Sequence, residues 1–184
     1  MDTPEALSRA EELLKPFAQT SSRPTPERLD VMVLPSALVA TVRALISGGW
    51  GYLIAITGVD RPGELAPTPE DKQWARLARD EEEVSASKGP EGSIEILYHF
   101  GHKAAVVTLR TSVRYSFPVI NSICDVIPSA TLYERELIEM FGVKVVGTPS
   151  KERLLLPDDW PAGVFPLRKT FKGLEESEAP VKEG

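Results

Sequence analysis

Two histidines are the side chains in this sequence best suited to acid–base chemistry at neutral pH. His99 and His102 stand on either side of a predicted turn. A catalytic histidine needs a carboxylate or a nucleophile beside it, and the neighbouring sequence supplies no such cluster. On a strand, His99 points away from Tyr98 and Phe100, which indicates a solvated or interface position. The pattern therefore favours a structural role for both histidines.

The sequence contains one cysteine, Cys124, which excludes an internal disulfide and a metal site built from several cysteines. Because apolar Ile120 and Ile123 precede it, we expect a buried, unreactive thiol. The glycines form neither a G-x-G-x-x-G nor a Walker A spacing, so no nucleotide-binding loop is predicted. The acidic run at residues 81–83 is typical of a solvated face. We expect this chain to have no catalytic residue and to bind no metal or cofactor.

Residues 133–142 hold the densest group of ionisable side chains next to apolar ones. The ionisable residues are Glu134, Arg135, Glu136 and Glu139. In one interpretation the charges are solvated while the apolar side chains of the same helix pack on a sheet, and the pattern alone favours this. In a second interpretation the segment is a protein interface. Arg135 and Glu139 are one helical turn apart and would form a fixed acid–base pair near apolar Met140.

The elements that position these residues are helices and strands in mixed order. Capping residues and hydrophobic periodicity predict helices at residues 3–16, 36–48, 116–127 and 129–142. Apolar runs predict strands at residues 29–34, 52–59, 94–100 and 104–109, the last two forming a hairpin. The first two strands should share one sheet through a right-handed crossover, because a helix separates them. Residues 19–26 are predicted to be a polar break, and residues 143–146 and 154–156 to be short extended pieces.

These elements predict an α+β fold, with a mixed β-sheet of about four strands, helices mainly on one face, and an extended C-terminal arm. We assign residues 1–27 to an N-terminal helix and linker. Residues 28–147 are assigned to the α+β domain, with an insertion at residues 60–92 that has one weakly apolar helical face. Residues 148–184 form the arm.

Proline and glycine punctuate the arm, so we expect it to gain stability by lying on a partner rather than by forming its own core. The expected apolar anchors are Phe165, Leu167, Phe171 and Trp160. We expect Arg168 and Lys169 to pair with acids of the partner. An equally good alternative places Trp160 in the core of the domain itself. Residues 169–184 are expected to be disordered when the chain is free.

The composition excludes several classes of function. Lys and Arg number 21 against 27 Asp and Glu in 184 residues, for a net charge of −6. This balance argues against a dedicated nucleic-acid-binding protein. No apolar run approaches the roughly 18 residues that a membrane-spanning helix needs, and the N-terminus lacks the regions of a signal peptide. We expect a soluble, cytosolic chain that contacts a membrane only through a partner.

A longer motif begins at Glu134-Arg135-Glu136 and continues through Glu139, Met140-Phe141 and Gly142 to a turn at Gly147 and Pro149. It extends through Arg153, the run Leu154-Leu155-Leu156-Pro157-Asp158-Asp159-Trp160, and Pro166-Leu167-Arg168-Lys169. Together with Gly58-Val59-Asp60 and Leu97-Tyr98-His99, this pattern resembles the respiratory complex I 30-kDa subunit family, the C-type or J-type subunits of NADH-quinone oxidoreductase. The resemblance covers about residues 28–172. Thr148 and Glu152 depart from it, where a histidine and a basic residue or proline are usual.

The resemblance implies a non-catalytic scaffold or assembly subunit in the hydrophilic arm of a proton-translocating NADH (or ferredoxin):quinone oxidoreductase. The expected partners are a 49-kDa-type large subunit and a neighbouring iron–sulfur subunit. The holoenzyme would use iron–sulfur clusters and quinone, and the chain would lie peripherally on the cytoplasmic side of the membrane. The expected interface residues are Glu134, Arg135, Glu136, Glu139, Met140, Phe141, Gly142, Arg153, Pro157, Asp158, Trp160, Leu167, Arg168 and Lys169.

Two alternatives remain open at this point. The chain could be the equivalent small subunit of a membrane-bound [NiFe] hydrogenase or of an F420-dependent relative. In a different class, it could be a free-standing small enzyme that uses His99 or Glu136, although no catalytic cluster supports that function.

Overall fold

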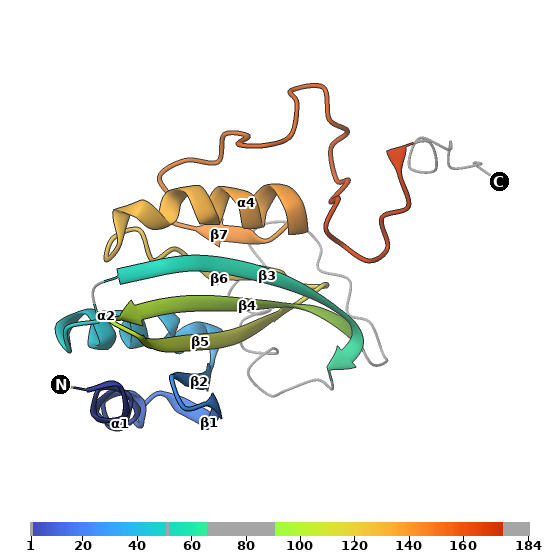
Figure 1. Ribbon diagram of the computed structural model, residues 1–184. Coiled ribbons are helices and arrows are strands. Elements are labelled where there is room, and N and C mark those ends of the chain that lie inside the picture. The colour runs from blue at the N-terminus through green and yellow to red at the C-terminus, as the bar shows by residue number, and fades with distance from the viewer. Residues whose placement is uncertain (1, 51, 66–90, 175–184) are drawn as a thin grey trace.

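The computed structural model describes residues 2–50, 52–65 and 91–174. Its main element is a five-stranded mixed β-sheet with strand order β1-β2-β5-β4-β3 (Figure 1). The strands are β1 (Ala18–Thr25), β2 (Arg28–Val33), β3 (Tyr52–Leu65), β4 (Glu91–His102) and β5 (Ala105–Arg114). β2 pairs with β5 in parallel, and the other neighbours pair antiparallel. β2 and β3 therefore run in the same direction within one sheet, as the predicted strand–helix–strand unit requires.

In the described part of the chain, three α-helices contribute to a single core with one face of this sheet. α1 (Thr3–Leu14) packs on β2, β5 and α2 (Leu38–Ser47), whereas α4 (Thr131–Phe141) lies along the edge strand β3 (Figure 1). A second sheet pairs β6 (Val119–Asn121) with β7 (Lys144–Val146) in parallel. The short 3₁₀ helices η1 (Pro35–Ala37) and η2 (Pro128–Ala130) lead into α2 and α4. The predicted α+β class is confirmed.

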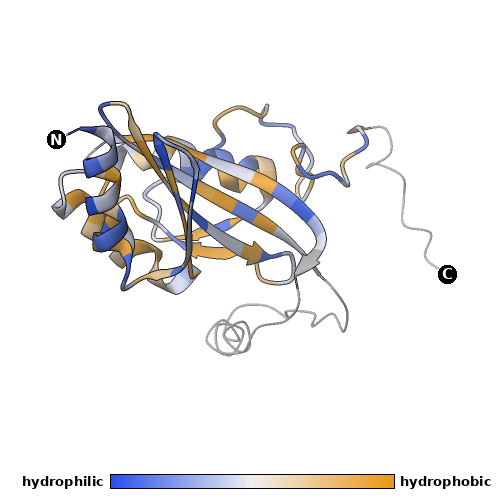
Figure 2. Ribbon diagram, turned by 60° about the horizontal axis from the view of Figure 1, so that its bottom comes forward, coloured by the Kyte–Doolittle hydropathy of each residue, from blue (hydrophilic) through white to orange (hydrophobic). Residues whose placement is uncertain are grey.

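Alternating side chains of the central strands form the core. In β4, Ile94, Ile96, Tyr98 and Phe100 are at most 1% exposed and join one hydrophobic cluster with residues of the helices. Figure 2 shows the alternation of apolar and polar residues as orange and blue bands along the strands. This period-2 pattern directs one face of the sheet towards the helices.

The opposite face of the sheet carries a ladder of ion pairs. The carboxylates of Asp30 and Glu95 are 6% and 5% exposed and lie between arginines. Arg28 Nε is 2.6 Å from Asp30, Arg61 Nη2 is 2.9 Å from Glu95, and Arg110 contacts both carboxylates. Because a buried carboxylate without a partner would carry a large desolvation cost, the arginines satisfy charges that the strand register places on this face.

The helix predicted at residues 116–127 is wrong. Val119–Asn121 form strand β6, and residues 122–127 form loop and turn before η2. Pro118 cannot donate a hydrogen bond, and the β-branched side chains of Val119 and Ile120 favour extended backbone, which here pairs with β7. The apolar spacing of this segment reflects burial of loop side chains rather than a helical face.

The polar break predicted at residues 19–26 is also wrong, because these residues form most of β1. All but the first residue of this edge strand are exposed, so the sequence shows none of the alternation by which strands are predicted. The cap of α1 is Asp2, whose side chain accepts from Glu5 N at 2.9 Å, and not Thr3. β3 and β4 extend beyond their predicted ends, and the rest of the expected insertion, residues 66–90, lies outside the described residues.

Candidate partner-binding site

The first glutamate of the predicted motif, Glu134 on α4, is buried inside the protein. Its side chain is 1% exposed and accepts hydrogen bonds from Ser122 Oγ at 2.8 Å, Ile123 N at 2.8 Å and Cys124 Sγ at 3.2 Å. These donors satisfy the carboxylate and fix the loop after β6. Burial raises the pKa of the Cys124 thiol, so the sulfur remains protonated and can donate to Glu134. The prediction that Cys124 is buried is confirmed.

The next turn of α4 holds the start of the C-terminal arm. Arg135 donates from Nε to the carbonyl of Glu152 at 2.7 Å and from Nη2 to the carbonyl of Arg153 at 2.5 Å. Glu139 accepts from three successive main-chain N–H groups, those of residues 154, 155 and 156, at 2.9–3.2 Å. The two side chains at this helical spacing therefore bind the backbone of residues 152–156, and no ion pair between them is found in the described part of the chain. Whether a partner also contacts them stays a prediction.

A second contact fixes the arm where it passes the end of α4. The N–H of Leu167 donates to the carbonyl of Met140 at 3.2 Å, and Arg168 Nε donates to the carbonyl of Phe141 at 2.8 Å. Asp60, on β3, is 4% exposed and accepts from the main-chain N–H of Lys169 at 2.7 Å. Residues from β3 and α4 thus hold the same short stretch of the arm.

Tyr115 joins this second contact from the end of β5. Its hydroxyl donates to Asp60 Oδ1, and the Arg168 guanidinium lies over its ring, with Cζ 5.0 Å from the ring centroid. Burial and the hydrogen bond to Asp60 raise the pKa of Tyr115 to about 12. The phenol is therefore neutral at physiological pH and remains a donor to the carboxylate.

Two glycines allow aromatic rings to pack closely at this point. A Cβ on Gly58 would lie 2.5 Å from the ring of Phe141, and one on Gly142 would lie 2.3 Å from the ring of Phe165. Gly142 also has φ +69°, the left-handed conformation that ends α4. Gly58 and Gly142 belong to the motif noted in the sequence, and their lack of a side chain lets Phe141 pack on β3 and Phe165 pack on the end of α4.

The arm has internal order between its two contacts with the domain. Arg153 donates to the carbonyls of Pro157 and Trp160, the latter at 2.7 Å. Trp160 Nε1 donates to the carbonyl of Val164 at 2.9 Å, and its ring centroid is 6.1 Å from that of Phe171. Trp160 thus packs within the arm and is not part of the main hydrophobic cluster.

The structure brings together most of the predicted interface residues around α4 and the arm. Pro157, Asp158 and Lys169 are exposed, and the side chain of Glu136 makes no hydrogen bond or ion pair with the described residues. Asp60 was visible in the sequence as part of Gly58-Val59-Asp60, but its contact with Lys169 spans 109 positions. No local sequence signal points to Tyr115, because only the fold places it beside Asp60.

The two histidines occupy separate structural positions. His99 Nδ1 is 3.0 Å from Thr108 Oγ1 on the neighbouring strand, and burial followed by the charge of Arg28 lowers its pKa. The His102 ring lies 5.5 Å from the Trp50 ring. Among residues 2–50, 52–65 and 91–174, no group of three or more His, Cys, Asp or Glu is arranged to hold a metal ion.

Several large apolar side chains remain exposed around the arm. Leu155, Leu132 and Leu167 are 61%, 55% and 51% exposed, with Leu154 and Leu174 exposed to a smaller degree. Leu132 lies at the start of α4, and the others lie on the arm. Exposed leucines gathered on one segment are typical of a protein-binding surface. No helix in the described ranges is long and apolar enough to cross a membrane.

One family model matches most of the chain. The family model for the respiratory-chain NADH dehydrogenase 30 Kd subunit matches residues 31–177. The C subunit of the NADH-quinone oxidoreductase of Herpetosiphon aurantiacus is 32% identical over 117 residues, covering 55% of this chain and 68% of that protein.

Two other relatives are a hydrogenase subunit and a formate hydrogenlyase subunit. Membrane-bound hydrogenase subunit beta of Pyrococcus furiosus is 46% identical over 59 residues, covering 32% of this chain and 34% of that protein. Formate hydrogenlyase subunit 5 of Escherichia coli is 38% identical over 77 residues, covering 42% of this chain and 14% of that protein. The match thus spans about a third or less of the length of these two relatives.

The fold also matches solved structures. A chain of the membrane-bound sulfane sulfur reductase, described as an archaeal respiratory membrane complex, superposes with a TM-score of 0.69 at 21% identity, covering 94% of this chain and 89% of that chain. The trypsin-resistant fragment 1–134 of Nqo5 superposes with a TM-score of 0.53 at 19% identity, covering 79% of this chain and 96% of that one. At these identities the likeness concerns the fold.

Proposed function

Because the chain belongs to the respiratory-chain NADH dehydrogenase 30 Kd subunit family, we propose that it is a non-catalytic structural subunit of a proton-translocating NADH (or ferredoxin):quinone oxidoreductase. It lies in the hydrophilic arm of that complex and supports electron transfer to quinone by holding neighbouring subunits in place. Its partners are a 49-kDa-type large subunit and an adjacent iron–sulfur subunit. Those subunits carry the redox chemistry, and this chain is peripheral on the cytoplasmic side of the membrane.

The observation that carries this proposal is that side chains of the domain hold the arm by hydrogen bonds to its backbone. Arg135 and Glu139 bind the backbone of its first part, and Asp60 binds the backbone of its later part. Hydrogen bonds to main-chain groups leave the side chains of the arm available, and the leucines at positions 155 and 167 are more than half exposed. An arm held in one conformation before binding loses less entropy when a partner docks on it.

The second candidate is the equivalent subunit of a membrane-bound hydrogenase. The observation that favours it is the identity of 46% to the Pyrococcus furiosus hydrogenase subunit beta, higher than the 32% to the C subunit of the Herpetosiphon aurantiacus oxidoreductase, although over a shorter alignment. In both candidates the chain is a docking subunit. The candidates differ in the large subunit that the arm contacts.

Purification of the tagged chain from the membranes of its native host tests the proposal. We expect a stable complex in which mass spectrometry identifies a 49-kDa-type large subunit and an iron–sulfur subunit in amounts equal to the tagged chain. A large subunit with the four cysteine ligands of a nickel site would favour the hydrogenase candidate. Elution of the chain as a free monomer, under conditions in which other membrane complexes of the host remain intact, would contradict both.

A further inference from the structure

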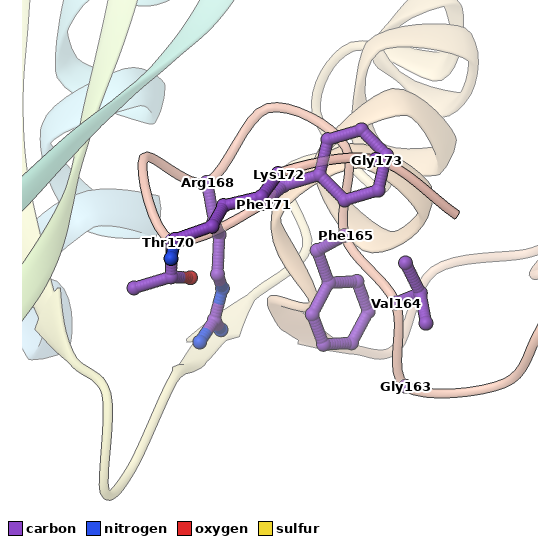
Figure 3. A pocket seen from close by; sticks show the side chains of 8 residues that line it. All are labelled: Gly163, Val164, Phe165, Arg168, Thr170, Phe171, Lys172 and Gly173. Carbon is purple, nitrogen blue, oxygen red and sulfur yellow. The ribbon is translucent and has the colours of Figure 1, made fainter. Parts of the chain in front are cut away.

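The arm forms a pocket of about 320 Å³ where it turns back between residues 163 and 173 (Figure 3). Gly163 and Gly173 have positive φ angles of 78° and 117°, which allow the backbone to bend at both ends of this stretch. The lining combines two cations, two aromatic rings and a hydroxyl with small residues: Gly163, Val164, Phe165, Arg168, Thr170, Phe171, Lys172 and Gly173.

The guanidinium of Arg168 is held in one orientation at this pocket. Its Nε donates to the carbonyl of Phe141, and its Cζ lies 4.9 Å from the centroid of Phe165 and 5.0 Å from that of Tyr115. In Figure 3 the Arg168 side chain extends beside the Phe165 ring. A guanidinium fixed by stacking and by one hydrogen bond loses little freedom when its remaining donors bind a ligand.

The terminal nitrogens of Arg168 have no acceptor among the residues that the structure describes, because its one hydrogen bond there uses Nε. Burial lowers the pKa of Arg168, and the charges of Tyr115 and of the nearby acid Asp60 act in the opposite direction. The oxygens of Asp60, however, accept from the Tyr115 hydroxyl and from Lys169 N. Four N–H donors on Nη1 and Nη2 thus remain available in the fork geometry that fits a carboxylate.

We propose that this pocket binds the carboxylate of an aspartate or glutamate from the partner subunit, held by Nη1 and Nη2 of Arg168. Lys172 adds a second positive charge to the lining, in a chain whose net charge is −6. Leu167 and Leu174, on either side of the Arg168–Lys172 stretch, are 51% and 38% exposed. A protein segment, unlike a free small anion, would cover these leucines while it placed its acid in the pocket. The inference rests on the proposed function, since it names the chemistry with which the arm recognises its partner.

Binding of the purified 49-kDa-type large subunit to the full-length chain tests the pocket. We expect Arg168→Gln to weaken this binding by about tenfold or more, because a charge-assisted bidentate contact is lost. Lys151→Gln is the matched control, since it removes one positive charge from an exposed position of the same arm. It should leave the Kd unchanged. Equal Kd values for the wild-type chain and Arg168→Gln would overturn the proposal.

A zero-length cross-link gives a second readout that a merely loosened arm would not produce. In the complex formed by Arg168→Lys, a carbodiimide should couple the introduced amine to an Asp or Glu of the large subunit, identified by mass spectrometry. Coupling to Glu175, Glu176 or Glu178 of the same chain would show that its own carboxylates fill the site and would refute the proposal. If the wild-type chain itself fails to bind the large subunit, the proposed function fails. Normal wild-type binding without an effect at position 168 refutes the pocket alone.

Discussion

Carboxylates at three positions of this protein hold distant segments by their main-chain N–H groups. Glu134 binds the N–H of Ile123, Glu139 binds those of residues 154–156, and Asp60 binds that of Lys169. Charge-assisted bonds of this kind are stronger than bonds between neutral groups. The charged residues of the motif therefore stabilise the positions of loops and of the arm, although their sequence pattern alone favoured solvated charges.

The shifted pKa of Tyr115 predicts a specific loss of stability in alkali. The phenol has a pKa of about 12 in the folded protein and an ordinary value of 10.0. A raised folded-state pKa means that the neutral form is favoured by folding, so this contribution is complete below pH 10 and is lost as the pH rises from 10 to 12.

We expect the free energy of unfolding in urea to fall over this pH range, and to fall less steeply in Tyr115→Phe. The phenylalanine variant keeps the ring beneath Arg168 and removes the titrating group. Buried Tyr98 also has a raised pKa, but it is present in both proteins and cancels in the comparison. The same slope in both proteins would show that the hydrogen bond to Asp60 contributes nothing to folding.

The helices and strands that have a clear hydrophobic pattern were predicted from the sequence. α4 ends at Phe141 with Gly142 as its C-cap, and β3 and β4 follow from their apolar runs. β1 escaped prediction because its side chains are exposed, and β6 because its partner β7 is more than 20 positions away in sequence. The site residues on α4 were predicted from the sequence. The contact of Asp60 with Tyr115 was not, because it depends on the register between strands, which a local sequence pattern does not contain.

The contact between α4 and β3 depends on the absence of a side chain at Gly58. A Cβ there would lie 2.5 Å from the Phe141 ring, so we expect Gly58→Ala to destabilise the protein by about 1–3 kcal/mol through overpacking. Urea unfolding measures the change. Phe141→Leu should recover part of the loss when the two substitutions are combined. Strict additivity in this double-mutant cycle would show that the ring and the glycine do not interact.

The hydrogen bonds from Arg135 on α4 to the arm predict different effects on stability and on assembly. Arg135→Ala removes two hydrogen bonds to exposed carbonyls and should cost only about 1 kcal/mol of unfolding free energy. Trypsin should nevertheless cleave faster after Lys151 or Arg153, and less of the chain should enter its complex. Glu136→Ala, a neighbour on the same helix, is the control that should leave proteolysis unchanged. If Arg135→Ala reduced the stability of the chain as much as its assembly, the prediction would be wrong.

The described part of the molecule consists of a hydrophobic core and an arm. Hydrogen bonds from Arg135 and Glu139 hold the first part of the arm, and a hydrogen bond to Asp60 holds its later part. The main hydrophobic cluster is built from residues 6–145, and Leu156 is the one residue of the described part of the arm (residues 148–174) that packs against it. Truncation after Pro157 leaves this cluster intact but removes the Phe165 ring from Gly142 and the main-chain donor from Asp60. We expect a folded protein with a single unfolding transition, destabilised by about 1–3 kcal/mol because a buried carboxylate loses a donor. Near-ultraviolet circular dichroism and urea unfolding measure both properties.

Truncation after Leu174 keeps both sets of contacts between the arm and the domain. It should retain wild-type stability and partner binding, whereas the chain truncated after Pro157 should fail to bind. A shorter chain that unfolds without a cooperative transition would instead show that the arm belongs to the folding unit of the domain.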